Sequence, residues 1–397
     1  MTAQSDTQNT AVENSQEGQF QTAQVSTIAF GHFVHDIFSS GFIPTLLPIL
    51  REKLLLNYEQ AGFLAFCLQA PGILNPLIGY MADKVNLRYF VILAPAVSAT
   101  LITLSGMVTD YVTMVFLMLC VGVSIAAFHV PAPAMIARIS GNRIGMGMSF
   151  YMFGGETART IGPLIAVSAI TWLTFEGVWR LSIIAWLTSA FLFVRLRHID
   201  ARANKKNNAS LDSFWPIALS VFPQILFIFL ARVPMLAAIT IYLPTFMKDE
   251  LDSSLWLGAG ALTILEGAGA TGIMFTGSLS DRFGRISMLR ILLVAAPFLL
   301  FAFLLSPAWA LPVVLILLGF TAITPAPVLM AIIQDYFPDH RAFGNGILMA
   351  INFFLRGVGI WVVGLLADQV GLTTAFWWTG FLYFLSIPAV MMLPKVK

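Results

Sequence analysis

The sequence predicts an all-α membrane protein of twelve transmembrane helices, arranged as two pseudo-symmetric six-helix bundles. Three observations predict this fold: a shortage of charge, a series of long apolar windows, and an internal repeat. Of 397 residues, 58% are hydrophobic and only 11% are charged, and the mean hydropathy is +0.83. A soluble domain carries about 25% charged residues, so this chain has too few polar groups to cover a water-exposed surface of its size.

Twelve windows of the chain are long and apolar enough to cross a bilayer, which takes about 20 mostly apolar residues. They cover roughly residues 25–50, 59–82, 89–108, 111–137, 144–172, 178–197, 214–247, 255–280, 287–306, 309–335, 343–367 and 374–394. The windows lack the alternation of apolar and polar residues expected of outer-membrane strands. The sequence therefore predicts helices throughout.

Composition also divides the chain into a tail, two bundles and a linker. Residues 1–24 are rich in Gln, Ser and Thr and contain no Lys or Arg, which excludes a signal peptide and predicts a disordered cytoplasmic tail. Residues 25–197 form the predicted N-terminal bundle, residues 198–213 a polar, basic cytoplasmic linker, and residues 214–397 the C-terminal bundle.

The basic residues predict the orientation. Fifteen of the 22 Lys and Arg residues fall in the alternate connections that include both ends of the chain, and four fall in the others. Because Lys and Arg accumulate in cytoplasmic loops, we expect both termini in the cytoplasm, as in a multi-pass protein of the inner membrane. The net charge of +2 gives no reason to expect nucleic-acid binding.

Matching residues in the two halves indicate a duplication. Gly79-x-x-x-Asp83-Lys84 has a counterpart 198 residues later in Gly277-x-x-x-Asp281-Arg282. Three further pairs follow in the same order along the chain: Pro44-Thr45 with Pro244-Thr245, Pro131-Ala132-Pro133 with Pro325-Ala326-Pro327, and Arg159-x-x-Gly162 with Arg356-x-x-Gly359. Parallel repeats of six spans are the architecture of one large class of secondary transporters, which bind substrate between the halves.

The repeated loop motif resembles the loop signature of the major facilitator superfamily. The second copy runs from Gly277 to Arg285, and the first from Gly79 to Arg88. The resemblance implies that these loops lie at the cytoplasmic ends of the second and eighth spans, where their charges hold a cytoplasmic gate closed. The implied gate residues are Gly79, Asp83, Lys84, Arg88, Gly277, Asp281, Arg282 and Arg285.

A narrower resemblance is to the fosmidomycin-resistance branch of that superfamily. It is carried by His32-x-x-x-Asp36, Phe128-His129, Ala137-Arg138 with Ser140-Gly141, Gly154-Gly155 and Gly162-Pro163-Leu164. The resemblance implies proton-driven export.

The ionisable residues inside the spans are the candidate site, because a charge at the bilayer centre costs at least about 2.5–3.5 kcal/mol. His32, His35 and Asp36 share one helix face by their spacing, and with Glu156 and Glu266 they are the candidate proton-coupling residues. In the structural alternative, His35 and Asp36 only satisfy the backbone or a neighbouring helix.

The candidate substrate-cavity residues are Arg159, Arg232, Arg356 and His129. Arginine binds carboxylates and phosphonates in a bidentate manner. In the structural alternatives, Arg159 pairs with Glu156, the other two arginines neutralise Glu266 or Asp36, and His129 is a packed core residue.

These observations favour a proton-coupled secondary transporter that exports a small, anionic or amphipathic molecule or drug. The alternative is a proton-coupled importer of an anionic metabolite or metal chelate. A transition-metal transporter is less favoured, and no metal site is predicted, because the chain has no local ligand spacing such as H-x-x-x-H. We expect no enzymatic activity, a monomer in the lipid bilayer, protons and a small molecule as partners, and no cofactor beyond the proton gradient.

Overall fold

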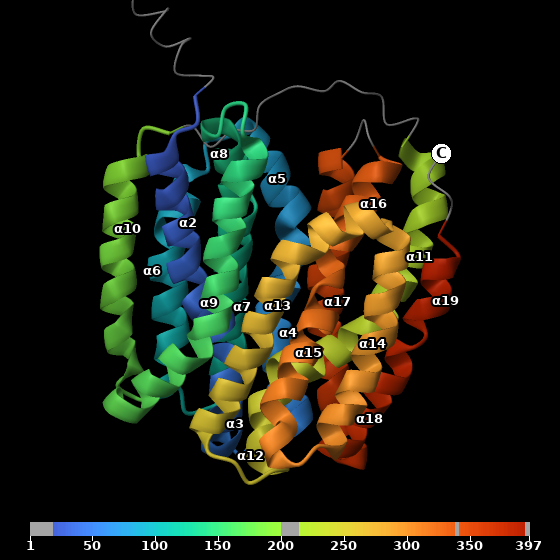
Figure 1. Cartoon of the computed structure of the whole chain (residues 1–397). Coiled ribbons are helices and arrows are strands. Elements are labelled where there is room, and N and C mark those ends of the chain that lie inside the picture. The colour runs from blue at the N-terminus through green and yellow to red at the C-terminus, as the bar shows by residue number, and fades with distance from the viewer. Residues whose placement is uncertain (1–18, 200–213, 338–340, 394–397) are drawn as a thin grey trace, which may run out of the picture.

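The computed structural model describes residues 19–199, 214–337 and 341–393. Within helices it describes only the backbone of Asp83, Gly277, Ser278, Asp281, residues 341–343 and Asn345. In the described residues the chain is all-helical and forms two halves that stand side by side (Figure 1). The predicted linker, apart from residues 198 and 199, lies outside the described residues.

Each half contains six spans, several of them made of more than one helix. The first half consists of α2 (Thr22–Asp36), η1 (Ile37–Gly41), α3 (Ile43–Leu54), α4 (Tyr58–Gln69), η2 (Ala70–Leu74), α5 (Asn75–Lys84), α6 (Arg88–Leu104), η3 (Ser105–Met107), α7 (Tyr111–His129), α8 (Pro131–Ile139), α9 (Ile144–Leu173), η4 (Val178–Leu181) and α10 (Ser182–Leu196). The second consists of α11 (Phe214–Ala237), η6 (Ala238–Tyr242), α12 (Leu243–Asp249), α13 (Leu255–Phe283), α14 (Arg285–Leu305), η7 (Ala308–Ala310), α15 (Leu311–Ile323), α16 (Pro325–Tyr336), α17 (Arg341–Val370), α18 (Leu372–Tyr383) and α19 (Ser386–Met391).

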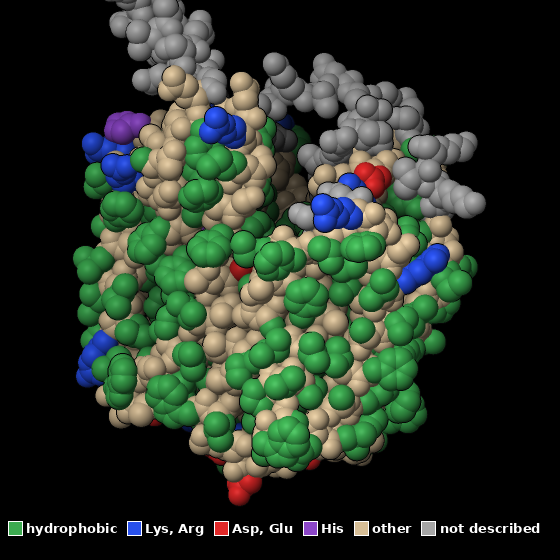
Figure 2. Space-filling model, viewed as in Figure 1, with side chains coloured by type: hydrophobic (Ala, Val, Ile, Leu, Met, Phe, Trp, Pro, Cys, Tyr) green, Lys and Arg blue, Asp and Glu red, His purple; other side chains and the backbone are tan. Residues whose placement is uncertain are grey.

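Eleven of the spans in the described residues are long and apolar enough to cross a membrane. The remaining span, α9, is 30 residues long. It falls outside this group because Glu156, Arg159 and several glycines lower its mean hydropathy. Large apolar side chains cover the sides of the molecule (Figure 2), with Phe116 68% and Leu219 73% exposed. Such a surface is compatible with lipid and not with water, so this is a multi-pass membrane protein.

The first described helix overlaps the end of the predicted N-terminal tail. The described chain begins at Gln19, and α2 begins at Thr22. The backbone N–H of Gln21 donates to the carbonyl of Ile139, 3.0 Å away at the end of α8. This hydrogen bond attaches the start of α2 to its own bundle, which polar composition alone could not indicate.

The internal repeat is visible in the helix geometry. In the first span the π-helical turn η1 precedes α3, which has Pro44 in its first turn, and in the seventh span the π-helical turn η6 precedes α12, which has Pro244 there. A proline removes a backbone hydrogen bond and crowds the preceding turn, and a wide π turn accommodates that defect. Pro131 and Pro325 likewise begin α8 and α16.

The halves meet mainly through α4 against α17 and α9 against α13. At the lower end in Figure 1, α3 also packs against α12. There Arg51 pairs with Asp249, and Lys248 pairs with Glu52. These contacts join residues of the two halves, so this end, which we call the closed end, is sealed by polar contacts between the bundles.

Asp368 of α17 adds a helix cap to the closed end. Its carboxylate oxygens accept hydrogen bonds from the backbone N–H groups of Tyr58 and Glu59, at 2.9 and 2.7 Å. These are among the N–H groups that a helix cannot satisfy within itself, and a carboxylate near a helix N-terminus is favourable. The first turn of α4 is therefore completed by a side chain of the other half.

The opposite end carries the loop motifs and is hollowed between the halves (Figure 2). The described side-chain pairs of the motif loops lie within one half: Lys84 with Tyr80, and Arg285 with Asp335 at 2.6 Å. We call it the open end.

We predict that the closed end depends on Gly364 of α17. A Cβ atom at this position would lie 2.4 Å from the carbonyl oxygen of Tyr58 on α4, and backbone cannot yield as a side chain can. Because overpacking costs about 1–3 kcal/mol, Gly364→Ala should lower the midpoint of thermal unfolding in detergent.

Gly346→Ala on the same helix is the matched control, because no atom lies within 4 Å of a Cβ built there. It should leave the midpoint unchanged or slightly raised. Equal midpoints for the two variants would contradict the proposed close contact.

Candidate functional site

Three of the predicted residues meet at one point between α2 and α7. His32 Nε2 lies 3.3 Å from Asp36 Oδ2, and His129 Nε2 lies 3.5 Å from Asp36 Oδ1. The two Nε2 atoms are 3.3 Å apart. The helical spacing of His32 and Asp36 brings these two together, whereas His129 comes from the end of α7. We call these three residues the histidine–aspartate cluster.

Hydrogen bonds on the far side of each imidazole ring fix the cluster. His32 Nδ1 lies 2.8 Å from the carbonyl oxygen of Tyr151, and His129 Nδ1 lies 3.1 Å from that of Ile125. A carbonyl only accepts, so each Nδ1 carries its hydrogen and donates it. In the neutral rings both Nε2 atoms then present lone pairs toward the Asp36 carboxylate. Ser39 Oγ donates to Asp36 Oδ1 at 3.4 Å, but in these tautomers no hydrogen lies between the carboxylate and either Nε2 atom. The cluster can therefore hold a cation or a proton.

Packing holds His32 in this orientation. Its ring stacks on Tyr151 with centroids 4.0 Å apart, and it lies against the backbone of Gly155 on α9. A Cβ atom at Gly155 would lie 2.5 Å from His32 Cε1. The residue must therefore be glycine for the imidazole to fit between the helices.

His35 lies beside the cluster without joining it. Its ring is fully buried, stacks on Phe128 at 4.5 Å and is 5.5 Å from the ring of His129. Neither ring nitrogen makes a hydrogen bond of normal geometry with the described residues. The shared helix face correctly suggested proximity, but the ring points to a different neighbour.

A second group, which we call the arginine–carboxylate group, connects the halves. Arg159 of α9 pairs with Glu156 one turn away, and its Nε lies 3.9 Å from Glu266 Oε2 on α13. Arg356 of α17 lies within electrostatic range of both carboxylates and of Asp36, and its guanidinium approaches Thr240 Oγ1 at 3.5 Å. The structure therefore brings together residues that sequence reasoning could only name one by one.

The total charge links the histidine–aspartate cluster to the arginine–carboxylate group. Asp36, Glu156 and Glu266 contribute three negative charges, whereas Arg159 and Arg356 contribute two positive charges. With neutral histidines the combined set lacks one positive charge. A single proton on the histidine–aspartate cluster balances it, which matters because an uncompensated charge in a low-dielectric interior is costly.

Arg232 lies apart from both groups. It is 1% exposed, and its guanidinium donates to the carbonyl of Ala322 at 3.1 Å, near the break between α15 and α16. Both residues belong to the second half. The structure thus places this arginine inside one bundle and not among the other predicted cavity residues.

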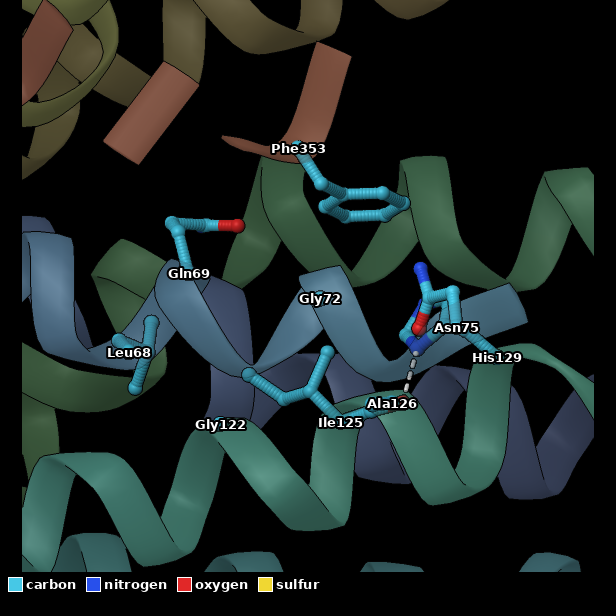
Figure 3. Close-up of a pocket in the computed structure, with 9 residues that line it drawn as sticks. All are labelled: Leu68, Gln69, Gly72, Asn75, Gly122, Ile125, Ala126, His129 and Phe353. Atoms are coloured by element: carbon cyan, nitrogen blue, oxygen red, sulfur yellow. Dashed lines mark hydrogen bonds between the residues drawn. The ribbon is translucent and has the colours of Figure 1, made fainter. Parts of the chain in front are cut away.

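A small pocket of about 10 Å³ lies next to His129 (Figure 3). It is lined by Leu68, Gln69, Gly72, Asn75, Gly122, Ile125, Ala126, His129 and Phe353. Phe353 comes from the second half and the other residues from the first, so the pocket lies between the bundles. Asn75 Oδ1 is buried without a hydrogen-bond partner among the described atoms, which leaves an amide acceptor for a ligand.

The predicted gate residues lie at the open end. Only the backbone of Asp83, Gly277 and Asp281 is described, while Lys84 and Arg282 are exposed. Arg285 pairs with Asp335 and donates to the carbonyl of Ala331 at 2.5 Å. Gly79 is loosely packed, with Val130 Cγ1 3.8 Å from a Cβ built there. Arg88 begins α6.

Sequence reasoning missed the supporting residues Tyr151, Asn75, Phe353, Asp335 and Asp368. Asn75 is a polar residue in an apolar run, and the two aspartates end apolar spans, so their positions were visible signals. Nothing in the chain marks Tyr151 or Phe353, because aromatic residues are frequent in every span.

Comparison with known proteins identifies a family and related proteins that match most of the chain. A family model described as Major Facilitator Superfamily matches residues 28–324 and 261–397. The fosmidomycin resistance protein of Escherichia coli (strain K12) is 23% identical over 383 residues, covering 93% of this chain and 92% of that protein. An uncharacterized MFS-type transporter of Bacillus subtilis (strain 168) is 25% identical over 378 residues, covering 92% and 91%.

Solved structures share the fold. A crystal structure of the nucleoside transporter NupG has a TM-score of 0.73 at 16% identity and covers 94% of this chain and 99% of that one. A bacterial homologue of the human lysosomal transporter Spinster, in an inward-facing and unoccupied conformation, has a TM-score of 0.75 at 14% identity and covers 94% and 95%.

We predict that Arg159→Met destabilises the protein by about 3 kcal/mol or more, because it leaves the Glu156 and Glu266 carboxylates without their partner in the interior. Chemical unfolding in detergent, followed by tryptophan fluorescence, measures this change. Adding Glu156→Gln to Arg159→Met should restore part of the stability.

Arg143→Met is the control, because this exposed arginine lies at the start of the same helix. It should change stability little. If Arg159→Met were as stable as Arg143→Met, the charge-pairing account would be wrong.

Proposed function

Because the chain belongs to the Major Facilitator Superfamily, a family of membrane transporters, we propose that it is a proton-coupled secondary transporter that works by alternating access. The observation that supports proton coupling is the histidine–aspartate cluster. The two Nε2 atoms approach the Asp36 carboxylate with no hydrogen between them in the neutral rings, and Asp36 carries the charge that one proton neutralises. Histidine binds and releases protons near neutral pH, so His32 and His129 relay the proton, and His35 lies one turn away as a neighbour.

Glu156 and Glu266 extend the coupling across the halves. Arg159 contacts both carboxylates. Protonation of Glu266 weakens the attraction between α9 and α13, protonation of Glu156 leaves Arg159 to Glu266 alone, and a substrate anion bound to Arg159 or Arg356 competes with Glu266. Proton binding and substrate binding thus act on one inter-bundle contact, which is the differential interaction that alternating access requires.

We propose that the open end faces the cytoplasm. It carries the motif loops and most of the described Lys and Arg side chains, and such residues collect on the cytoplasmic side. The described chain begins at this end, and its last helix, α19, runs toward it (Figure 1). The orientation gives an inner-membrane protein with cytoplasmic termini, in an inward-open state. In the outward-open state Gly79, Asp83, Lys84, Arg88, Gly277, Asp281, Arg282 and Arg285 would close the cytoplasmic gate.

We favour export of a small anionic or amphipathic molecule or drug in exchange for protons. The pocket beside His129 combines Phe353 with the free acceptor of Asn75, a combination that suits an amphipathic ligand. The fosmidomycin resistance protein, by its name, acts in drug resistance, and its similarity extends over nearly the whole chain. The proton gradient supplies the energy without a further cofactor, and one chain in the lipid bilayer forms the whole transport unit.

A second candidate is proton-coupled import of an anionic metabolite or metal chelate through the same site. The arginines at membrane depth favour it, since Arg159 and Arg356 would hold a carboxylate or phosphonate. Transport into inside-out and right-side-out vesicles under the same proton gradient separates the two directions.

We predict that Asp36→Asn reduces substrate-driven proton flux in liposomes to that of empty liposomes, because the amide cannot carry the transported proton. The measurement uses a pH-sensitive dye inside the liposomes and a panel of fosmidomycin, nucleosides and carboxylates. Wild-type protein that moved no protons with any compound would refute coupled transport by these ligands.

Asp110→Asn is the matched control. Asp110 is exposed and caps α7, accepting a hydrogen bond from the N–H of Thr113 at 2.8 Å, which holds the pKa of its carboxyl below the usual value. Because Asn caps a helix equally well, this variant should fold and transport like the wild type. Loss of proton flux in Asp110→Asn would show that the assay does not report on Asp36.

A further inference from the structure

The structure assigns to the histidine–aspartate cluster a second ligand class, a divalent transition-metal ion, and we propose that Zn²⁺ binds there. Three ligand atoms of the types zinc prefers, two imidazole nitrogens and one carboxylate oxygen, converge at one point. All lie within 4.8 Å of one another in the described structure.

The separations between ligand atoms are close to those around a tetrahedral ion. Zinc binds histidine nitrogen and carboxylate oxygen at about 2.0–2.2 Å, and two corners of a tetrahedron are then about 3.3–3.6 Å apart. His32 Nε2 lies 3.3 Å from both His129 Nε2 and Asp36 Oδ2, whereas His129 Nε2 lies 3.5 Å from the other carboxylate oxygen, Oδ1. With a single oxygen as the ligand, the three atoms all lie within 4.8 Å of one another, so a rotation of the Asp36 carboxylate, without movement of the helices, would complete the site.

The outer atoms of both rings have the arrangement that metal-binding histidines require. A ligating histidine almost always donates its other ring N–H to a carbonyl or carboxylate. His32 and His129 both do so, toward the carbonyls of Tyr151 and Ile125. These bonds leave the Nε2 lone pairs free for the ion, and stacking on Tyr151 and contact with Gly155 hold the His32 ring in place.

The ion has an access route and an open fourth position. The side chain of His129 is 17% exposed and lines the pocket between the bundles. With three protein ligands, the fourth corner would be taken by water from this pocket, as in zinc sites that bind small molecules. The arginine–carboxylate group offers no comparable site, because Arg159 already occupies both of its carboxylates.

The ligand set also selects among ions. Two imidazoles with one carboxylate suit zinc and its first-row neighbours, whereas Mg²⁺ and Ca²⁺ favour oxygen ligands and Cu⁺ favours sulfur. A zinc ion and the coupling proton would use the same lone pairs and exclude each other. Zinc binding itself is independent of the proposed proton transport, so either can fail without the other.

The test is isothermal titration of Zn²⁺ into the purified full-length chain in detergent, without a polyhistidine tag and without a proton gradient. We expect one ion per chain. Loss of an outer hydrogen bond to a ligand already costs about 10–100-fold in affinity, so we expect His129→Gln and Asp36→Asn each to weaken binding by at least about 100-fold. His198→Gln removes an exposed histidine and should leave the affinity unchanged.

A second measurement covers the case in which a variant does not fold. Co²⁺ bound to the wild type should show the intense visible absorption of a tetrahedral site, and Zn²⁺ should abolish that absorption. Three results would overturn the proposal: absence of stoichiometric Zn²⁺ binding, unchanged affinity in folded His129→Gln, or the weak spectrum of octahedral Co²⁺.

Discussion

The organisation of this protein depends on one constraint: a charge placed between helices must have a partner close by. Arg159 meets it with two carboxylates, Glu156 on its own helix and Glu266 on the other half. The same ion pair that stabilises a charge thereby holds α9 against α13 in the middle of the molecule. In the proposed mechanism stability and transport depend on the same ion pairs, because an event that changes the charge of Glu266 or Arg159 changes how firmly the halves are joined.

The fold was largely predictable because it follows from patterns along the sequence, namely the length of the apolar windows and the internal repeat. Bilayer thickness sets the length of an apolar window, so all twelve spans could be placed, including α9 with its internal charges. The repeat was equally readable, and Pro44 and Pro244 indeed occupy equivalent positions after π-helical turns. The start of α2 could not be predicted, because the hydrogen bond between Gln21 and Ile139 depends on how α8 packs beside it.

The sequence could name candidate residues for the site but not which of them contact one another. Rarity of charge identified Asp36 and Arg232 equally well. Which of them joins the shared site depends on the rotation of each helix about its axis, which composition does not encode. Arg232 turns toward the Ala322 carbonyl inside its own bundle, whereas His129 turns toward Asp36. Ligand spacing along the chain likewise failed to show that residues of α2 and α7 converge.

The paired π turns have a mechanical consequence. Each separates a long inner helix, α2 or α11, from a short outer one, α3 or α12, and the two outer helices pack against each other at the closed end. A π turn is a place where a helix can kink sharply. The outer segments can therefore pivot while the inner helices, which carry His32, Asp36 and Arg232, keep their places. Access from the closed end would then depend on the movement of two helices, α3 and α12, and would not require rotation of the whole bundles.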